Sequence, residues 1–474
     1  MKLKHLFLTA LVVGSLASCS KDDDGPNEPV YKQFDTNLSI LATSNTNKLT
    51  KSSVESGDPE EGLDNEADIN TLTAYVFYAD GGEQKLAAKQ TITSSDEGSI
   101  DRIEDIIVKV DATEAGQISK TSLKVVLLAN VKLTKEPATF SELENGLISG
   151  IDGYSVDGVK SGTTYLPMGS KVIVIPAGKL IAGTDYDNWI TLESSDVKVT
   201  NVEQQAKDAD KQPIVGGGDL DISKLKDQQK IALTRYVARI QLEGLDCNFA
   251  GNYKDATFTV KTVSIANASN SSKLLGEDLF ALQNVLGQTN ISGEYDQTNA
   301  FFRGYPETID RVDYYLAAGT QKNVLKKEYE NGVVINNEHS VLFKGADNAS
   351  EDAPEMARFY VFEFQNYAIG QDLNPKDGDK LGSSGTNEIY TTLIITGEWN
   401  NGPVKGVRNF RIPIKSTDSA GGEGVMRNNV YKVSATLTGE GTDNPDKNML
   451  NACISFIVDV QPWKVIKQTE DDVN

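Results

Sequence analysis

Alternating apolar and polar residues predict β-strands along most of this chain. From residue 34 to residue 42, every second position suits a buried face, and these positions are Phe34, Thr36, Leu38, Ile40 and Ala42. A period of two places successive side chains on opposite faces, so the run predicts a half-buried first strand. The large apolar residues of this strand are Phe34, Leu38 and Ile40.

Further strand-like runs, rich in β-branched and aromatic residues, recur between clusters of Gly, Asp and Asn. In the first half they span 71–78, 106–110, 123–130 and 171–176, and a weaker helical pattern covers 222–229. After the glycines at 216–218 the strand pattern resumes at 230–242, and later runs span 256–265, 341–343, 359–364, 390–396, 409–414 and 430–437. These runs predict two all-β domains of about 200 residues each, divided near 225–235, which we assign to 52–230 and 231–450.

The last run of the chain has the strand pattern too and leaves two interpretations open. Its apolar residues are Ile454, Phe456, Val458 and Val460, followed after a proline by Trp463. A flexible lead-in at 439–448 would let this strand leave its own domain. The strand would equally well close the sheet of its own domain.

The first 18 residues have the features of an export signal. Lys2 and Lys4 precede an apolar block at 6–17, which is too short to span a bilayer permanently. Small residues then lead to Cys19, a position where a thiol can be acylated and become the new N-terminus. We therefore assign 1–18 as a lipoprotein signal peptide and Cys19 as the lipid anchor.

The segment 19–51 combines a tether, the first strand and the beginning of an exposed loop. Residues 20–33 are polar and interrupted by proline, as in flexible tethers. Residues 43–61 contain hardly any apolar side chain, and loops of this kind are where proteases cut. We expect 19–51 to behave as a propeptide that carries a removable strand.

The net charge excludes two classes of partner. The chain has 68 acidic and 46 basic residues, a net charge of −22, and loss of Lys2 and Lys4 with the leader changes it to −24. Such an acidic protein repels nucleic acid and anionic lipid, and the sequence has no basic patch that would reverse this. No second apolar run near 18 residues follows the leader, so we expect no membrane-spanning segment in the mature chain.

Cysteine and histidine are too scarce for most catalytic and metal sites. Beyond Cys19 the chain has Cys247 and Cys453, and the sequence leaves open whether these two pair. His339 is the one histidine outside the leader, which excludes a His-rich zinc site, and it lies in a predicted turn before a strand. We expect no catalytic residue, metal or cofactor.

Six short segments in order resemble the fimbrillins, the subunits of type V pili of Gram-negative anaerobes. These segments are Leu72–Phe77, Val125–Asn130, Tyr165–Ser170, Leu233–Ile240, Val425–Val433 and Val458–Trp463. Each is short and hydrophobic, but together with the leader and the acidic tether they cover essentially the whole chain. The run at 22–24 resembles a surface-export signal of such lipoproteins, and it is equally compatible with a solvated tether.

This resemblance implies a fold, a function and an assembly mechanism. Fimbrillins have two transthyretin-like β-sandwich domains in tandem and travel to the cell surface as outer-membrane lipoproteins. A trypsin-like protease removes the first strand, and the C-terminal strand of a neighbouring subunit fills the groove, giving a head-to-tail polymer. The chain would then be a non-enzymatic fimbrial (pilus) subunit for adhesion and biofilm formation, with 451–474 as its donor strand. Its partners would be further copies, accessory tip and anchor subunits, and host or bacterial surface receptors.

The maturation site departs from the fimbrillin pattern. The best-known members are cut after Arg, but the first Arg here is Arg102, well inside the first predicted domain. Lys48 and Lys51 occupy the exposed loop instead, and Lys51 matches better by position. A cut there makes Ser52 the new N-terminus and discards Cys19 with its lipid.

Other functions compete with this one. A fimbrial tip or anchor subunit is the alternative within the family. A surface glycan-binding lipoprotein would cluster exposed aromatic residues, whereas the candidates Trp189, Tyr253 and Trp399 are scattered along the chain.

Two clusters of acidic residues suggest enzymatic or metal-binding alternatives that their spacing does not favour. A hydrolase would need paired carboxylates, and the densest run is typical of a solvated face; its members are Glu60, Glu61, Asp64, Glu66 and Asp68. Asp443, Asn444 and Asp446 lack the spacing of an EF-hand calcium loop.

Overall fold

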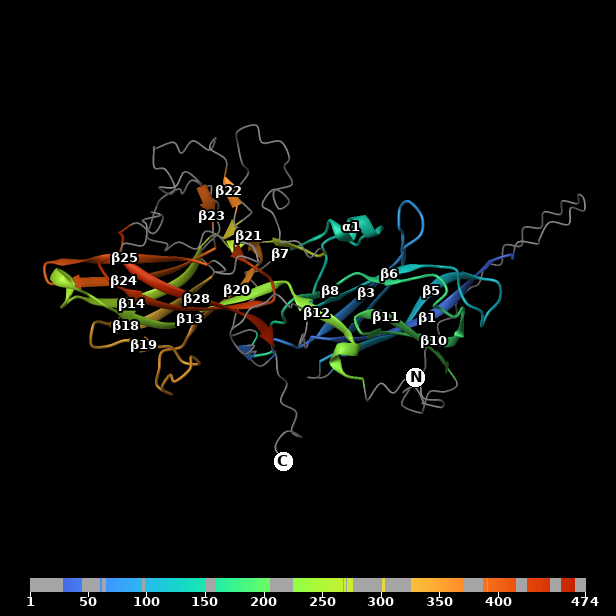
Figure 1. The fold of residues 1–474 in the computed structure, drawn as a ribbon, viewed down its shortest axis with the longest axis horizontal. Helices are drawn as coiled ribbons and strands as arrows, with labels where there is room; N and C mark the ends of the chain where they lie inside the picture. The colour runs from blue at the N-terminus through green and yellow to red at the C-terminus, as the bar shows by residue number, and fades with distance from the viewer. Residues whose placement is uncertain are drawn as a thin grey trace, which may run out of the picture.

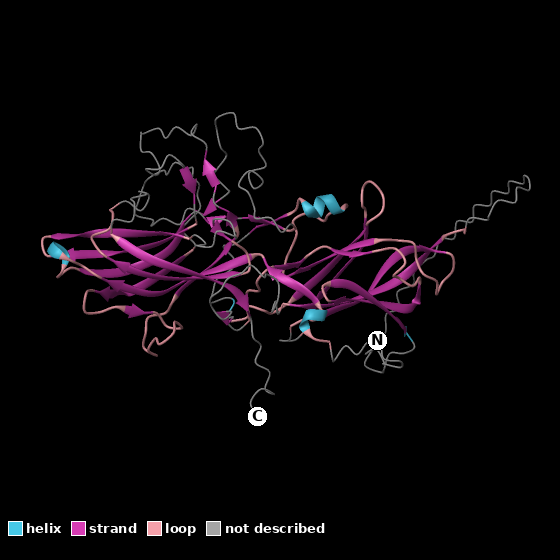
Figure 2. Ribbon diagram, in the orientation of Figure 1, coloured by secondary structure: helices cyan, strands magenta, loops and turns pink. Residues whose placement is uncertain are grey.

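The computed structural model describes residues 29–44, 60–61, 65–95, 99–149, 159, 161–204, 225–266, 268–269, 271–275, 301–302, 325–365, 367–369, 387–389, 391–414, 424–443 and 453–464. Within these ranges the chain is almost entirely β-structure, as Figure 2 shows. Its strands form two elongated sandwiches that lie end to end (Figure 1). The predicted all-β fold is therefore confirmed.

The N-terminal sandwich has two layers that share strand β1. One layer has the order β5-β1-β10-β11 and consists of β1 (Lys32–Thr43), β5 (Arg102–Ala112), β10 (Gly183–Glu193) and β11 (Asp196–Glu203). The other has the order β4-β3-β6-β8-β12 and consists of β3 (Thr71–Tyr78), β4 (Leu86–Thr93), β6 (Leu123–Ala129), β8 (Met168–Ser170) and β12 (Ile231–Arg235), with β9 (Ile173–Ile175) also paired to β6. The end of β1 pairs with β12, so β1 joins the two layers.

The C-terminal sandwich also has two layers. One consists of β2 (Glu60–Glu61), β13 (Val237–Cys247), β19 (Val341–Leu342), β20 (Ala357–Phe362), β27 (Asn429–Leu437) and β28 (Ile454–Lys464), and β28 lies between β27 and β2. The other has the order β18-β14-β24-β25 and consists of β14 (Thr257–Ala266), β18 (Lys326–Ile335), β24 (Thr392–Asn401) and β25 (Val404–Pro413). Alternating Val, Ile and Phe side chains fill the space between the layers, as strand propensity predicts.

Shorter elements complete the described chain. Four two-stranded pairs join β15 (Ala268–Ser269) to β17 (Phe301–Phe302), β16 (Ser271–Lys273) to β7 (Leu147–Ser149), β21 (Phe364–Gln365) to β26 (Gly424–Val425), and β22 (Tyr367–Ile369) to β23 (Asn387–Ile389). Helix α1 (Phe140–Glu144) begins at Thr139, whose side chain accepts a hydrogen bond from the backbone N–H of Glu142. The helical pattern expected at 222–229 appears as one 3₁₀ turn, Asp227–Gln229.

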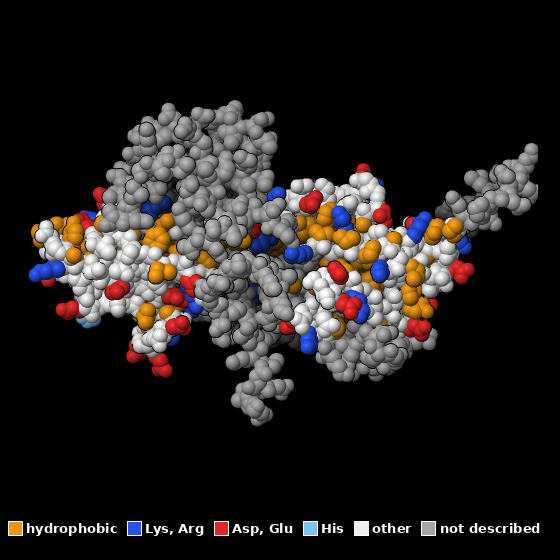
Figure 3. Space-filling view, in the orientation of Figure 1, with side chains coloured by type: hydrophobic (Ala, Val, Ile, Leu, Met, Phe, Trp, Pro, Cys, Tyr) orange, Lys and Arg blue, Asp and Glu red, His pale blue; other side chains and the backbone are white. Residues whose placement is uncertain are grey.

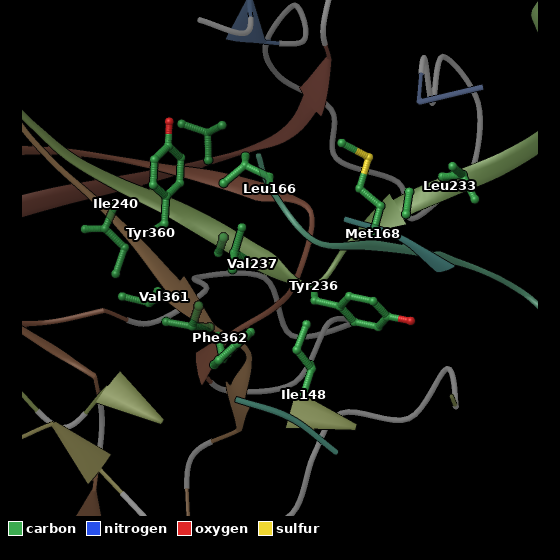
Figure 4. Close-up of a cluster of buried hydrophobic side chains, with 14 of the residues drawn as sticks. Ile148, Leu166, Met168, Leu233, Tyr236, Val237, Ile240, Tyr360, Val361 and Phe362 are labelled. Atoms are coloured by element: carbon green, nitrogen blue, oxygen red, sulfur yellow. The ribbon is translucent and has the colours of Figure 1, made fainter. Parts of the chain in front are cut away.

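The chain passes from one sandwich to the other at Tyr236, next to the boundary expected near 225–235. The Tyr236 side chain is 1% exposed, and its hydroxyl donates to the carbonyl oxygen of Leu274, 2.9 Å away. A Cβ on Gly169 would lie 1.9 Å from that hydroxyl, so only glycine allows β8 to approach the ring this closely. Figure 4 shows Tyr236 beside Met168 of the N-terminal sandwich, with Val237 and Phe362 of the C-terminal one nearby.

Candidate functional site

Strand β1 occupies a slot between two other strands of the N-terminal sandwich. It runs antiparallel to β5, from the pair Lys32–Ala112 to the pair Leu41–Arg102. On its other side it runs parallel to β10, where Ile40 lies opposite Ile190. Because β1 has ladder partners along both edges, its removal would leave two rows of unpaired backbone groups facing each other.

The sequence predicted a half-buried strand here, and the structure corrects this. No residue from Thr36 to Thr43 is more than 8% exposed, so both faces of that part of β1 are buried. Leu38 and Ile40 are completely buried in the main core, whereas Phe34 packs partly against it. The prediction failed because polar residues alternate with apolar ones, yet hydrogen bonds rather than solvent satisfy them.

A hydrogen-bonded network covers the polar face of β1. Ser39 Oγ donates to the Asp187 carboxylate, 2.8 Å from Oδ1 and 2.9 Å from Oδ2, and both residues are 0% exposed. The side-chain amide of Asn188 donates to the backbone carbonyl oxygen of Asn37 over 2.9 Å. A buried carboxylate is stabilised by such donors, so Asp187 places a chemical requirement on whatever strand occupies the slot.

An apolar contact lies farther along the same face. Leu41 packs against Trp189, both are 0% exposed, and Val202 and Leu225 cover them. The slot therefore has three recognition features, which are the main core under Leu38 and Ile40, the Asp187 carboxylate, and the Trp189 surface.

The C-terminal strand, β28, lies in the sheet of its own domain. It pairs antiparallel with β27 from Leu437–Ile454 to Asn429–Pro462. Ile454 and Val458 are each 7% exposed, while Phe456 and Val460 are partly buried against the core. Of the two interpretations of the tail, the structure therefore shows the strand that closes its own sheet.

One large apolar residue of β28 has no place in that core. Ile457 points to the outer face and is 71% exposed. The end of β28 pairs with β2, where Glu60 lies opposite Trp463. The side chain of Trp463, and residues 451–452 and 465–474, lie outside the described residues.

The predicted maturation residues also fall outside the described part of the chain. Cys19, Lys48, Lys51 and Ser52 all belong to ranges that the structure does not describe. The flanking residues are described: β1 ends at Thr43 in the N-terminal sandwich, and β2 begins at Glu60 against the C-terminal one. The predicted site thus lies in the connection between a strand of one sandwich and a strand of the other.

Glu66, expected on a solvated face, is instead buried between the two sandwiches. It is 0% exposed, and both its carboxylate oxygens accept hydrogen bonds from Arg239 Nη1, at 2.9 and 2.8 Å. The Tyr360 hydroxyl donates to Glu66 Oε1 over 2.7 Å, and Arg235 Nε donates to the Glu66 carbonyl oxygen over 3.0 Å. A local acidic run gave no signal that one member would meet two arginines from distant strands.

Electrostatics at this junction follow from burial. Burial lowers the pKa of Arg235 to about 10, against the attraction of Glu66. Burial and the neighbouring Glu66 raise the pKa of the Tyr360 phenol well above its usual value, so Tyr360 remains a hydrogen-bond donor to Glu66.

The second junction cluster pairs Arg427 with Glu363. Arg427 Nε donates to Glu363 Oε2 over 2.5 Å, and the guanidinium lies 5.0 Å from the centroid of the Tyr236 ring. Ser272 Oγ also donates to Glu363 Oε1, over 3.0 Å. The Glu66 cluster therefore joins residues of both sandwiches, whereas Arg427, Glu363 and Ser272 all belong to the C-terminal half and contact the junction at Tyr236.

Of the remaining candidate residues, Trp189 lines the slot and the others lie apart from it. Trp189 and Trp399 are 0% and 1% exposed, and Tyr253 packs on Trp399 with ring centroids 5.6 Å apart, so these aromatics form no exposed platform for a sugar. His339 is exposed, with Nδ1 3.1 Å from Asn336 Oδ1. Asp443 is exposed, and Asn444 and Asp446 lie outside the described residues. Among the described residues, no group of three His, Cys, Asp or Glu side chains is arranged to hold a metal ion.

Cys247 and Cys453 are free thiols. They lie at strands β13 and β28, and β27 runs between these two strands. Two strand spacings add up to about 9.5 Å, which exceeds the Cα–Cα distance that a disulfide can bridge. Burial raises the pKa of the Cys247 thiol to about 12, which makes it unreactive at neutral pH.

On the face drawn in Figure 3, Lys and Arg side chains lie singly among acidic and uncharged groups. No helix within the described ranges is long and apolar enough to cross a membrane.

Comparison with known proteins adds a family match. Residues 36–235 match the model of a family described as major fimbrial subunit protein. That range runs from β1 to the end of β12, so it covers the N-terminal sandwich with its slot.

One curated relative and several solved structures are also similar. A Parabacteroides distasonis protein, named as a proposed fimbrium tip subunit, is 28% identical over 280 residues, which span 58% of this chain and 60% of that protein. A solved structure of a proposed cell adhesion protein from the same species has a TM-score of 0.54 and 19% identity, covering 91% of this chain and all of that one. A fimbrilin from Porphyromonas gingivalis has a TM-score of 0.52 and 17% identity, covering 92% of this chain and 99% of that one. At these identities the solved structures show a shared fold.

Proposed function

We propose that this chain is a structural and adhesive subunit of a cell-surface fimbria and not an enzyme, because residues 36–235 match the model of the major fimbrial subunit family. Its precursor is an outer-membrane lipoprotein held by Cys19. A trypsin-like protease cuts after Lys51, or after Lys48, and a strand from a neighbouring subunit then replaces β1. The subunit thereby leaves the lipid and joins a head-to-tail fibre.

The observation that carries this proposal is the position of β1. This strand has ladder partners on both edges and two buried faces, and it is followed in the sequence by the polar, lysine-containing segment 45–59, whose composition suits cleavage by a protease. Leu38, Ile40 and Leu41 are 0% exposed, and burial of three such side chains contributes about 5–9 kcal/mol gross. Association costs about 4–15 kcal/mol, so a replacement strand must bring comparable apolar side chains together with ladder hydrogen bonds.

The proposed donor is the C-terminal strand, with Ile454, Phe456, Val458, Val460 and Trp463 as its apolar residues. Since β28 is paired with β27 in its own sheet, donation requires that this ladder open first. Slow assembly that depends on maturation is the expected consequence.

A second candidate function, a fimbrial tip subunit, is favoured by the same strand. A tip subunit accepts a donor strand without supplying one, and a β28 that stays in its own sheet fits that role. The similarity to a protein named as a proposed tip subunit supports this candidate as well. Such a subunit would bind accessory fimbrial proteins below it and a host or bacterial receptor above it.

The test is maturation of the purified precursor by a trypsin-like protease. We expect intact mass and N-terminal sequencing to show a chain that begins at Ser52 without lipid, and unheated SDS electrophoresis to show a ladder of oligomers. A variant with Lys48→Gln and Lys51→Gln is the matched control and should give neither.

The outcomes separate the candidates. A chain that begins at Ser52 but forms no ladder with itself supports the tip subunit. Protein from the cell surface that still begins at lipidated Cys19 contradicts proteolytic maturation and would leave an anchor subunit or a surface glycan-binding lipoprotein as the better interpretation.

A further inference from the structure

The slot strand and the C-terminal strand share a five-residue pattern. Residues 38–42 read Leu-Ser-Ile-Leu-Ala, and residues 454–458 read Ile-Ser-Phe-Ile-Val. Each has one serine, at the second place, among four apolar residues. The third, fourth and fifth residues are all apolar. The pattern therefore departs from the simple alternation of a strand with one buried face.

In the slot, the second and fourth residues of this pattern both make specific contacts. The serine, Ser39, donates to the buried carboxylate of Asp187, and the fourth residue, Leu41, packs on Trp189. In the sheet of its own domain, the pattern at 454–458 makes neither kind of contact. Ser455 is exposed and Ile457 is 71% exposed. Ile457 is one of several large apolar side chains that are exposed among the described residues, and its transfer to a buried contact in the slot would be favourable.

We propose that residues 454–458 of a second copy of this chain bind the slot in one register, with Ser455 on Asp187 and Ile457 on Trp189. This inference rests on the donor-strand function proposed above and names its register and its selecting residue. Ile454, Phe456 and Val458 then take the places of Leu38, Ile40 and Ala42 in the main core.

The neighbouring registers are disfavoured by charge and polarity. A shift of the tail by two residues places Ile457 against Asp187, which leaves the carboxylate facing an apolar side chain in place of the Ser39 hydroxyl. A shift by four residues places Asp459 there, and two carboxylates in a buried site repel each other. Asp187 therefore selects a strand with a hydroxyl at this place.

The direction of the incoming strand follows from the two ladders. The slot presents β10 in parallel and β5 in antiparallel orientation to β1. A strand that enters in the same direction as β1 reuses both hydrogen-bond patterns, whereas a reversed strand would have to change both.

Disulfide trapping tests the register. Leu41 lies directly opposite Arg102 of β5, so a donor residue at the Leu41 place comes within disulfide reach of a cysteine at 102. Acceptor protein with Arg102→Cys is mixed with donor protein with Ser455→Cys, Ile457→Cys or Asp459→Cys, all with Cys453→Ser, and matured by protease. The three donor positions are exposed in the free subunit, so the variants should fold alike.

We expect a cross-linked dimer with Ile457→Cys, formed at least tenfold faster than with the other two donors. Fast cross-linking of Asp459→Cys or Ser455→Cys instead would overturn the register while leaving donor-strand exchange intact. If mass spectrometry shows release of the strand up to Lys51 but no oligomer forms in any mixture, the proposed self-assembly fails together with the register.

A second variant tests selection by Asp187. Ser455→Val removes the hydroxyl and should slow assembly about tenfold or more, because one hydrogen bond to a buried charge is lost. Ser455→Thr keeps a hydroxyl and should assemble at the rate of the unchanged chain. Ser434→Val is the matched control, because Ser434 is an exposed serine on β27 opposite Ile457 and stays in its own sheet. Equal assembly rates for Ser455→Val and Ser434→Val would contradict a role for Asp187.

Discussion

At the scale of single residues, buried polar groups carry information that the hydrophobic pattern does not. Ser39 was expected on the polar face of a half-buried strand and Glu66 in a solvated acidic run, yet both are 0% exposed. Their partners, Asp187 and Arg239, stand 148 and 173 positions away. A buried polar side chain is stable only with such a partner, so these residues fix the relative placement of distant strands.

Replacing Glu66 should destabilise the protein strongly. Glu66→Gln keeps the size of the side chain but removes the charge that faces Arg239 and Arg235, and we expect the free energy of unfolding to fall by about 3–5 kcal/mol. Urea unfolding monitored by fluorescence measures this. Glu83→Gln is the control, since the Glu83–Lys85 pair is about 70% exposed on both sides and should change stability by about 1 kcal/mol at most. Equal effects of the two variants would show that the buried pair does not hold the junction.

At the scale of elements, β1 and β28 contrast in how they are held. β1 has ladder partners along both edges, whereas β28 is paired fully along one edge and, among the described residues, only at its end along the other. An edge strand can be stripped from one end, residue by residue, while a central strand must leave two ladders at once. In the proposed strand exchange, β28 should therefore be released more easily than β1.

A cut at Lys51 alone should not free β1. The strand keeps its two ladders and its buried side chains after the cut, so we expect the fragment that ends at Lys51 to stay bound in native buffer. Size-exclusion chromatography followed by mass spectrometry should find both pieces in one peak, and addition of a synthetic peptide of residues 452–464 should release the fragment. Spontaneous loss of the fragment from the nicked protein would show that β1 is held far more weakly than its burial implies.

At the scale of the whole molecule, the two sandwiches form one elongated unit with ionic clusters at the junction (Figure 1). Strand β7 of the N-terminal half pairs with β16 of the C-terminal half, which adds a backbone connection to the two clusters. In the proposed fibre, these connections would join the slot of one sandwich to the tail of the other within each subunit.

Stability should decline in alkaline solution. Burial raises the pKa of six tyrosines above the ordinary value of 10.0, and these are Tyr75, Tyr78, Tyr236, Tyr329, Tyr360 and Tyr431. Above that pH the unfolded chain loses phenol protons that the folded chain retains, so the free energy of unfolding falls as pH rises. Arg235, whose pKa burial lowers to about 10, acts in the opposite sense, but it is one group against six tyrosines.

The measurement is the urea midpoint between pH 9 and pH 11. Tyr329→Phe should reduce the decline, because it removes one of the six phenols. The Tyr329 hydroxyl donates to the carbonyl oxygen of Glu355, so its loss removes a single hydrogen bond. A midpoint that stays constant over this range would contradict the argument.

The sequence by itself determined the all-β class, the position of β1, the alternation in the tail and the acidic character of the chain. These depend on local periodicity and composition, which a single chain displays directly. Only the tertiary structure decided that β1 is buried on both faces, that β28 closes its own sheet, and that Glu66 lies at the junction. The Tyr360–Glu66 hydrogen bond joins residues 294 positions apart, and Ser39 meets Asp187 only because β1 lies beside β10. Such contacts depend on which strands become neighbours, and that follows from packing of the whole chain rather than from any local pattern.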